Sequence, residues 1–90
     1  AVNMLTRVLA LEWAQYGISV NALAPGSFHT EMTNATWSDP ISIEKQLDTI
    51  PVRRAGKLRD LGVLAVYLAS AATDYMTGQV VYIDGGRTAI

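Results

Sequence analysis

The chain has 90 residues, half of them hydrophobic, and its 7 basic and 8 acidic side chains leave a net charge of −1. This length allows at most one small domain, and the near-neutral charge provides no basic surface for nucleic-acid phosphates. Because there is no cysteine, disulfides and cysteine-based zinc sites are excluded. No apolar run reaches the ~20 residues that cross a bilayer. We therefore expect a cytoplasmic protein with no nucleic-acid partner, no membrane partner and no metal site.

Residues 1–16 are predicted to form a helix that is apolar on two faces, with polar residues such as Thr6 and Arg7 between them. A helix of this kind is covered on both sides in the assembled protein. Gly17 is expected to end it in the left-handed conformation. The two apolar stripes are Val2, Leu5, Leu9, Trp13 and Tyr16, and Met4, Val8 and Leu11.

Residues 18–24 are predicted to form a short strand, bounded by Gly17 and by Pro25-Gly26. The strand is largely apolar on both faces, which is typical of a parallel sheet covered by helices. Asn21 is polar, and we expect its amide to satisfy backbone groups beside the strand.

The stretch that follows this strand, up to Gly56, lacks strong periodicity, and connections of that length are usually functional. Within it, Asp39 is predicted to cap a short helix that has Pro40 in its first turn. That helix is expected to end before Pro51. The pattern indicates a lid over about residues 27–56.

A second main helix is predicted over residues 58–72 and a second strand over residues 79–83. A helix that links two buried strands is a crossover unit of a parallel sheet, but two strands alone do not make a stable one. The missing initiator Met and the abrupt helical start suggest a fragment, so we expect an α/β fold that is incomplete on its own. The core face of the second helix is predicted to hold Leu58, Leu61, Ala65, Leu68 and Ala72.

The run NALAPGSFHTEM, residues 21–32, lies where the first strand is predicted to end. Ligands of open parallel sheets bind beyond the carboxyl ends of the strands. Pro25 is expected to stop the strand ladder because it has no N–H, and Gly26 lets the backbone turn close to a ligand. Backbone groups and the Thr30 hydroxyl could then bond a planar amide, and Thr30 could also cap a turn through Thr33. An ordinary turn is the alternative.

Four segments together resemble the C-terminal part of short-chain dehydrogenases/reductases, of the type that includes 3-oxoacyl-carrier-protein reductases and gluconate 5-dehydrogenases. They are AVNMLTRVLALEWAQYGISVNALAPGSFHTEM, IPVRRAG, LAVYLAS and YMTGQVVYIDGG. The resemblance implies that residues 1–90 are a C-terminal fragment of one NAD(P)-binding domain with a Rossmann-type doubly wound parallel sheet. It implies an oxidoreductase that interconverts a secondary alcohol and a ketone, on a sugar acid, polyol or 3-oxoacyl substrate. The NALAPG run argues against the enoyl-reductase branch of the family.

The resemblance assigns Pro25, Gly26, Ser27 and Phe28 to the loop whose backbone meets the nicotinamide, and Thr30 to the hydroxyl that bonds its carboxamide or phosphate. Met32 and the residues to about Ile50, Trp37 among them, correspond to the substrate-closing lid. The family's catalytic Tyr has a Lys four residues later, and no tyrosine here has that partner. The Gly-rich phosphate loop is also absent. We therefore assign no catalytic residue and expect residues 1–90 alone to be inactive.

Several alternatives stay open. His29 is either an ordinary loop residue or a substrate contact, Trp37 either packs in the lid or stacks on substrate, and Arg54 is either a lid anchor or solvated. Asp84-Gly85-Gly86 is expected to be a turn. The parent protein is expected to use NAD or NADP and to form a homotetramer, with a dimer as the alternative. A non-catalytic binding or regulatory protein and an oligomerisation module on the same fold are the competing functions.

Overall fold

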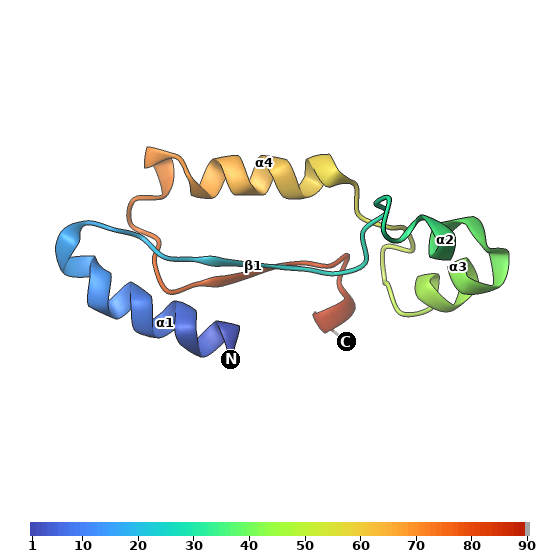
Figure 1. Cartoon of the computed structure of the whole chain (residues 1–90), viewed down its shortest axis with the longest axis horizontal. Helices are drawn as coiled ribbons and strands as arrows, with labels where there is room; N and C mark the ends of the chain where they lie inside the picture. Colours follow the sequence, from blue (N-terminus) through green and yellow to red (C-terminus); the bar gives the residue numbers. More distant parts are fainter. Residues whose placement is uncertain (90) are drawn as a thin grey trace. The chain divides into compact units, whose positions relative to one another are not determined.

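The computed structural model describes residues 1–89 and shows the expected order of helix, strand, long connection, helix and strand (Figure 1). The chain divides into two compact units, each treated separately below. The helical unit comprises residues 1–24 and 63–81, and the lid unit comprises residues 25–62 and 82–89. The helices and strands are α1 (Val2–Trp13), β1 (Ala22–Pro25), α2 (Asn34–Ser38), α3 (Pro40–Leu47), α4 (Leu58–Leu68) and β2 (Val80–Ile83), with short 3-10 turns η1 (Ala14–Tyr16), η2 (Ala71–Thr73) and η3 (Arg87–Ala89).

The first helix ends as the sequence predicts. After Trp13 it tightens into the 3-10 turn η1, and Gly17 then adopts the left-handed conformation with φ 72°. The Gly17 N–H donates to the Ala14 carbonyl at 3.0 Å, which satisfies one of the last carbonyls of the helix.

Within residues 1–89, the buried face of α1 consists of two small residues. Thr6 and Ala10 are its buried residues, at 5% and 2% exposure, whereas both apolar stripes are largely exposed. The Thr6 hydroxyl donates to the Val2 carbonyl at 2.8 Å, so a polar side chain is buried without losing a hydrogen bond. A Cβ on Gly78 would lie 3.4 Å from the Ala10 Cβ. Small side chains thus allow close approach, and the expected covering of both apolar stripes in the assembled protein stays a prediction.

The two strands pair in parallel, since hydrogen bonds from Ala22 N–H to Gln79 C=O and from Gly26 N–H to Ile83 C=O run in step. The strand begins at Ala22 and not at the predicted Ile18. Before it, one backbone bond, from the Gly78 N–H to the Val20 carbonyl at 2.7 Å, is joined by bonds to side chains. The Asn21 amide donates to the Met76 carbonyl at 3.1 Å, and its oxygen accepts the Gln79 N–H at 3.1 Å. The expectation that Asn21 satisfies neighbouring backbone groups is confirmed.

Pro25 does not stop the ladder, contrary to the prediction. The Gly26 N–H continues it by donating to the Ile83 carbonyl at 3.0 Å. Alternate residues of a parallel strand direct their N–H groups to opposite sides, so Ala22 and Gly26 face β2 and Pro25 faces away from it. The proline therefore removes a donor from the side of β1 on which residues 1–89 supply no further strand.

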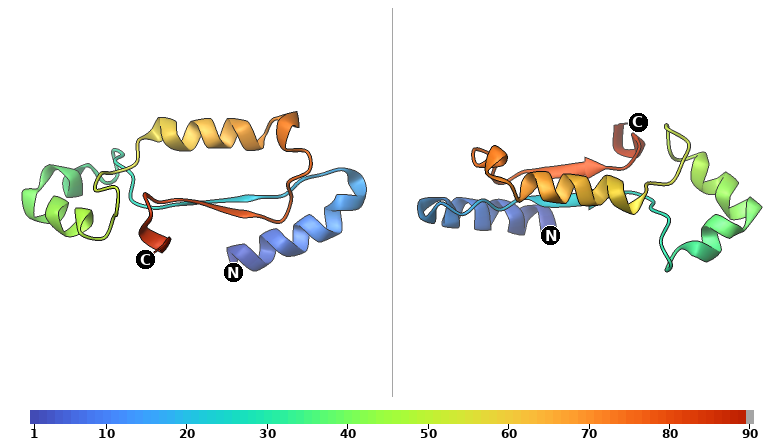
Figure 2. Two further views of the ribbon diagram at one scale, coloured as in Figure 1. Left: turned by 180° about the vertical axis from the view of Figure 1, so that it is seen from behind. Right: turned by 90° about the horizontal axis from the view of Figure 1, so that it is seen from above.

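Within the helical unit, α1 and residues 63–68 of α4 lie on opposite sides of the strand pair (Figures 1 and 2). Helices on both faces of parallel strands are the arrangement of doubly wound α/β sheets. The expected α/β class is therefore confirmed. Among residues 1–89, no helix is both long and apolar enough to cross a membrane.

The core face of α4 is shifted from its predicted position. Leu61, Leu64 and Leu68 are the half-buried leucines, whereas Leu58 and Ala65 are exposed. The helix also ends at Leu68, short of the predicted residue 72. Apolar residues recur all round this helix, so periodicity could not select the side that packs.

Candidate functional site

The loop that leaves β1 is fixed at its start by a close backbone contact in the lid unit. A Cβ added to Gly26 would lie 2.7 Å from the Asp84 Cβ and 2.8 Å from the Asp84 Cα. Backbone atoms cannot move aside as a flexible side chain can, so this position requires glycine. The structure thus gives Gly26 a packing role in addition to the close ligand approach inferred from the sequence.

The same loop is pinned to the end of the lid segment. Phe28 and Gly56 form an isolated parallel bridge, with the His29 N–H donating to Gly56 at 3.1 Å and the Gly56 N–H donating to Ser27 at 2.9 Å. A Cβ on Gly56 would lie 2.5 Å from the Phe28 ring. Sequence reasoning did not foresee this bridge, although a glycine just before a helix signals a close backbone approach.

The residues that the sequence assigns to the nicotinamide lie together on this loop. Pro25 is exposed, whereas Gly26, Ser27, Phe28 and Thr30 are half-buried. The Ser27 hydroxyl is 3.0 Å from the Gln46 Oε1 of α3, to which it donates. The described hydrogen bonds of residues 1–89 leave the N–H groups of Ser27 and Phe28 unused. A planar carboxamide needs such donors, so the chemistry of the loop fits a nicotinamide.

Thr30 is held by Thr33, a residue that sequence reasoning considered only as the end of a turn. The Thr30 N–H donates to the Thr33 hydroxyl at 2.9 Å, and the Thr33 N–H donates to the Thr30 carbonyl at 3.2 Å. The expected turn from Thr30 to Thr33 is therefore present. Thr33 is also the residue before α2, so the loop and the lid meet at this turn.

The predicted lid segment, about residues 27–56, contains α2 and α3, which pack on each other (Figure 2). The cap of α3 is as predicted, because the Asp39 side chain accepts the Ile41 N–H and Pro40 occupies the first turn. Met32 is 96% exposed and packs on nothing among residues 1–89. The expected place of Met32 in the substrate-closing lid stays a prediction.

His29 and Trp37 meet inside the lid unit. Their ring centroids are 6.3 Å apart, and the His29 Nε2 lies 3.0 Å from the Asn34 Oδ1 of α2. These contacts favour lid packing for Trp37. Beside them, His29, Thr30, Glu31, Asn34 and Leu58 line an open hollow of about 410 Å³.

The far end of the lid packs on the turn after β2. A Cβ added to Gly85 would lie 2.8 Å from the Ile50 side chain and 2.7 Å from the Val52 side chain. Ile50 is only 2% exposed. The Val52 N–H donates to the Gly85 carbonyl at 3.1 Å, and Pro51 lies against Gly86. Both glycines have positive φ, 65° and 95°, which confirms the expected turn.

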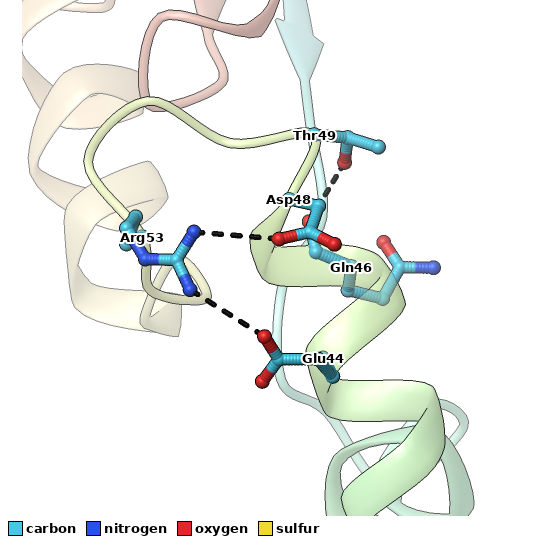
Figure 3. A network of polar contacts seen from close by, with 5 residues as sticks. All are labelled: Glu44, Gln46, Asp48, Thr49 and Arg53. Carbon is cyan, nitrogen blue, oxygen red and sulfur yellow. Dashed lines mark hydrogen bonds and ion pairs between the residues drawn. The ribbon is translucent and has the colours of Figure 1, made fainter.

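A polar cluster surrounds Arg53 next to this contact (Figure 3). Its guanidinium lies 3.5 Å from Asp48 and 3.9 Å from Glu44, and the Thr49 hydroxyl donates to the Gln46 carbonyl at 2.7 Å. More than half of each charged side chain is exposed, so each pair is worth no more than about 1 kcal/mol.

Two carboxylates of the lid unit are stabilised in their ionised form. The Lys57 N–H, followed by Arg54 at 3.5 Å, holds the pKa of Asp60 below its ordinary value. The Thr88 hydroxyl and the backbone N–H of Gly86 lower the pKa of Asp84 in the same way. Both carboxylates stabilise turns at the start of α4 and after β2. The ion pair between Arg54 and Asp60 is long, at 3.5 Å, and partly exposed. It can therefore anchor the lid segment only weakly.

No group of three or more potential metal ligands occurs among residues 1–89. Of the tyrosines, Tyr16, Tyr67, Tyr75 and Tyr82 are all exposed, and none has a lysine four residues later. The described part of the chain thus holds a loop that can bind an amide and a lid beside it, without the acid–base pair expected of the family.

Comparisons with known proteins agree with this arrangement. A galactitol 2-dehydrogenase (L-tagatose-forming) of Cereibacter sphaeroides is 47% identical over 88 residues, which is 98% of this chain and 35% of that protein. A 2-dehydro-3-deoxy-D-gluconate 5-dehydrogenase of Dickeya dadantii is 45% identical over 96% of this chain and 34% of its own length. The crystal structure of a gluconate 5-dehydrogenase from Burkholderia cenocepacia, in complex with NADP and tartrate, superposes with a TM-score of 0.91. It is 41% identical and covers 100% of this chain and 35% of its own.

The chain thus spans about a third of the length of the relatives that it matches. The profile of the family described as enoyl-(acyl carrier protein) reductase matches residues 1–88. The relatives described above are named as dehydrogenases, whereas the family model is named for an enoyl reductase. Our inference against the enoyl-reductase branch stays a prediction. The fold, the profile and the relatives agree with the resemblance seen in the sequence, and the chain belongs to the short-chain dehydrogenase/reductase family.

Proposed function

We propose that residues 1–90 form the C-terminal part of an NAD(P)-dependent oxidoreductase that interconverts a secondary alcohol and a ketone. The observation that carries the proposal is the loop of residues 25–30, which leaves the carboxyl end of a parallel strand with free backbone donors. A sugar acid or polyol is the favoured substrate, because relatives at 45–47% identity are dehydrogenases of such compounds. A 3-oxoacyl compound is the alternative.

In this proposal the loop binds and orients the nicotinamide. Pro25 and Gly26 bring the backbone close, Ser27 and Phe28 supply N–H donors, and the Thr30 hydroxyl bonds the carboxamide. The dinucleotide, when bound, accepts or supplies the hydride. The lid, with Met32 and Trp37, closes over the substrate and excludes water. NADP is present in the Burkholderia cenocepacia relative, and NAD remains the alternative for this chain.

Proton transfer from the substrate hydroxyl belongs to residues outside positions 1–90. The tyrosines of this chain have no lysine at the required spacing, so none is organised as a general base. We therefore expect purified residues 1–90 to oxidise no alcohol with either dinucleotide. Turnover by that segment alone would contradict the proposed division of roles.

The test on the intact protein compares Thr30→Ala with its neighbour His29→Ala. Loss of one hydrogen bond to the carboxamide is expected to raise the KM for the cofactor by a few-fold to about tenfold in Thr30→Ala. His29 contacts the lid residue Asn34, so His29→Ala is expected to change the cofactor KM less. A larger rise in the cofactor KM from His29→Ala than from Thr30→Ala would contradict the assignment of Thr30 to the carboxamide.

The same assays separate the competing functions. We expect the intact protein to bind the dinucleotide and to turn over sugar acids or polyols, measured by the absorbance of the reduced nicotinamide. Binding without turnover of any alcohol or ketone would instead favour a non-catalytic binding protein on this fold. Absence of dinucleotide binding would contradict both.

A further inference from the structure

The side chain of Thr33 bonds the loop before it and not the helix that it precedes. It is the residue before α2, where a threonine hydroxyl commonly accepts a backbone N–H from the first turn of the helix. In this structure its side chain makes no such cap bond. The hydroxyl is directed back to the loop instead, where it donates to the Phe28 carbonyl at 2.7 Å.

The Thr33 hydroxyl also organises Thr30. It accepts the Thr30 N–H at 2.9 Å and lies 3.3 Å from the Thr30 hydroxyl oxygen. A hydroxyl has a single hydrogen to donate. The Phe28 carbonyl, which can only accept, takes that hydrogen at the shorter distance, so Thr33 serves as the acceptor for Thr30. One side chain thereby fixes the backbone of residues 28–30.

The main chain of Thr33 ties the same network to the lid. Its carbonyl accepts the Trp37 N–H at 3.2 Å, which begins α2. A change in the position of α2 would therefore move Thr33 and alter its hydrogen bonds to Phe28 and Thr30. All of these groups belong to the lid unit.

We propose that Thr33 is a positioning residue: its hydroxyl holds Phe28 and Thr30 in the geometry that binds the nicotinamide carboxamide. This inference rests on the proposed function of the loop. Thr33 touches neither cofactor nor substrate in this account and acts through Phe28 and Thr30. The sequence signal is the spacing Thr30-x-x-Thr33, with two hydroxyls three residues apart after the glycine turn.

The test uses two variants of Thr33 in the intact protein and one matched control. Thr33→Val keeps the shape of the side chain and removes the hydroxyl, whereas Thr33→Ser keeps the hydroxyl. Ser38→Ala removes another hydroxyl of α2, whose bond goes to the Asn34 carbonyl at 2.7 Å within the same helix. Affinities are measured for NADPH and NADH and for their fragments without nicotinamide, 2′-phospho-ADP-ribose and ADP-ribose.

We expect Thr33→Val to weaken binding of the intact dinucleotide by about threefold to tenfold. Binding of the matching fragment should stay at the wild-type level, because the adenosine half does not meet this loop. Thr33→Ser and Ser38→Ala are expected to bind both ligands as the wild type does. The fragment also reports correct folding of each variant.

Three results would overturn the inference. Thr33→Val could bind the dinucleotide as tightly as the wild type, it could lose the dinucleotide and its fragment equally, or Thr33→Ser could fail to restore binding. The first two leave dinucleotide binding by the wild type intact, so the proposed function survives them. If the wild-type protein binds neither dinucleotide, the proposed function and this inference fall together.

Discussion

The helical unit and the lid unit are held together in different ways. In the helical unit, the buried residues of α1 are Ala10 and Thr6, and Leu11 is 81% exposed. In the lid unit, two glycines at which an added Cβ would lie less than 3.0 Å from a neighbour join segments far apart in sequence, Gly26 with Asp84 and Gly56 with Phe28. In the helical unit, hydrogen bonds of the Asn21 side chain make the long-range connection, to Met76 and Gln79. The residues of the candidate site are therefore held by contacts within the lid unit, whereas the helical unit leaves many large apolar side chains exposed.

Exposed apolar surface is the clearest sign of this difference. Contiguous exposed apolar patches of large size mark interaction surfaces in soluble proteins. The large hydrophobic residues exposed in the helical unit are Val2, Met4, Leu5, Val8, Leu11, Trp13, Tyr16, Ile18, Val63, Val66, Tyr67 and Tyr75, against Met32, Ile41, Val52, Leu58 and Tyr82 in the lid unit. We expect a homotetramer to cover the faces of the helical unit, with a homodimer as the alternative.

The largest effect is expected from a charge on the exposed face of α1. Leu11→Glu should split the assembly of the intact protein into smaller folded species, because each covered leucine contributes roughly 1.5–3 kcal/mol and is repeated by symmetry. Leu9 is only half-buried within this chain, and Leu9→Glu is expected to destabilise the fold instead. Mass in solution and circular dichroism of the two variants distinguish these outcomes. A monomeric wild type would remove the basis of the expectation.

Alanine substitutions at two glycines test whether the close contact between Gly26 and Asp84 stabilises the lid unit. Gly26→Ala would place a Cβ 2.8 Å from the Asp84 Cα, and such overpacking is expected to cost about 1–3 kcal/mol of unfolding free energy. Gly62→Ala is the control, since a Cβ there meets nothing within 4 Å on α4. It should stabilise the protein by up to about 1 kcal/mol. Thermal unfolding of both variants checks this, and equal stability of the two would contradict the contact.

The smallest effect is expected at the turn after β2, as a change in how the stability of the protein falls at acid pH. The Thr88 hydroxyl lowers the pKa of Asp84 in the folded state, so this contribution to stability is present above the unfolded pKa of about 3.9. It is lost as the pH falls through the folded pKa. Thr88→Val should therefore reduce the loss of stability between neutral and acid pH. Unfolding midpoints across that range measure it, and an unchanged pH dependence would count against the role of Thr88.

Much of the local structure could be predicted because the residues that determine it are neighbours in sequence. Gly17 ends the 3-10 turn that follows α1, and Asp39 with Pro40 starts α3. The glycines after β2 form a turn through their positive φ. The loop of residues 25–30 was likewise expected to follow a parallel strand, from the order of motifs along the chain.

The features that could not be predicted depend on contacts between residues distant in sequence. Nothing in the helical pattern of α1 singles out Ala10, because its burial involves Gly78, which lies far away in the sequence. The role of Pro25 required knowledge of which side of β1 meets β2. The contact of Ile50 with Gly85 joins residues that only the fold brings together.

The sequence by itself determined the α/β class, the glycine that follows the first helix, the cap of α3, the turn after β2 and the family, since these follow from local conformational preference and from the spacing of motifs. The tertiary structure alone decided which helix face is buried, where the ladder of β1 begins, and how Thr33 holds the candidate site. The physical reason is that backbone approach and hydroxyl orientation depend on atoms from other segments. Propensity and periodicity act within a single segment, and so they cannot specify those contacts.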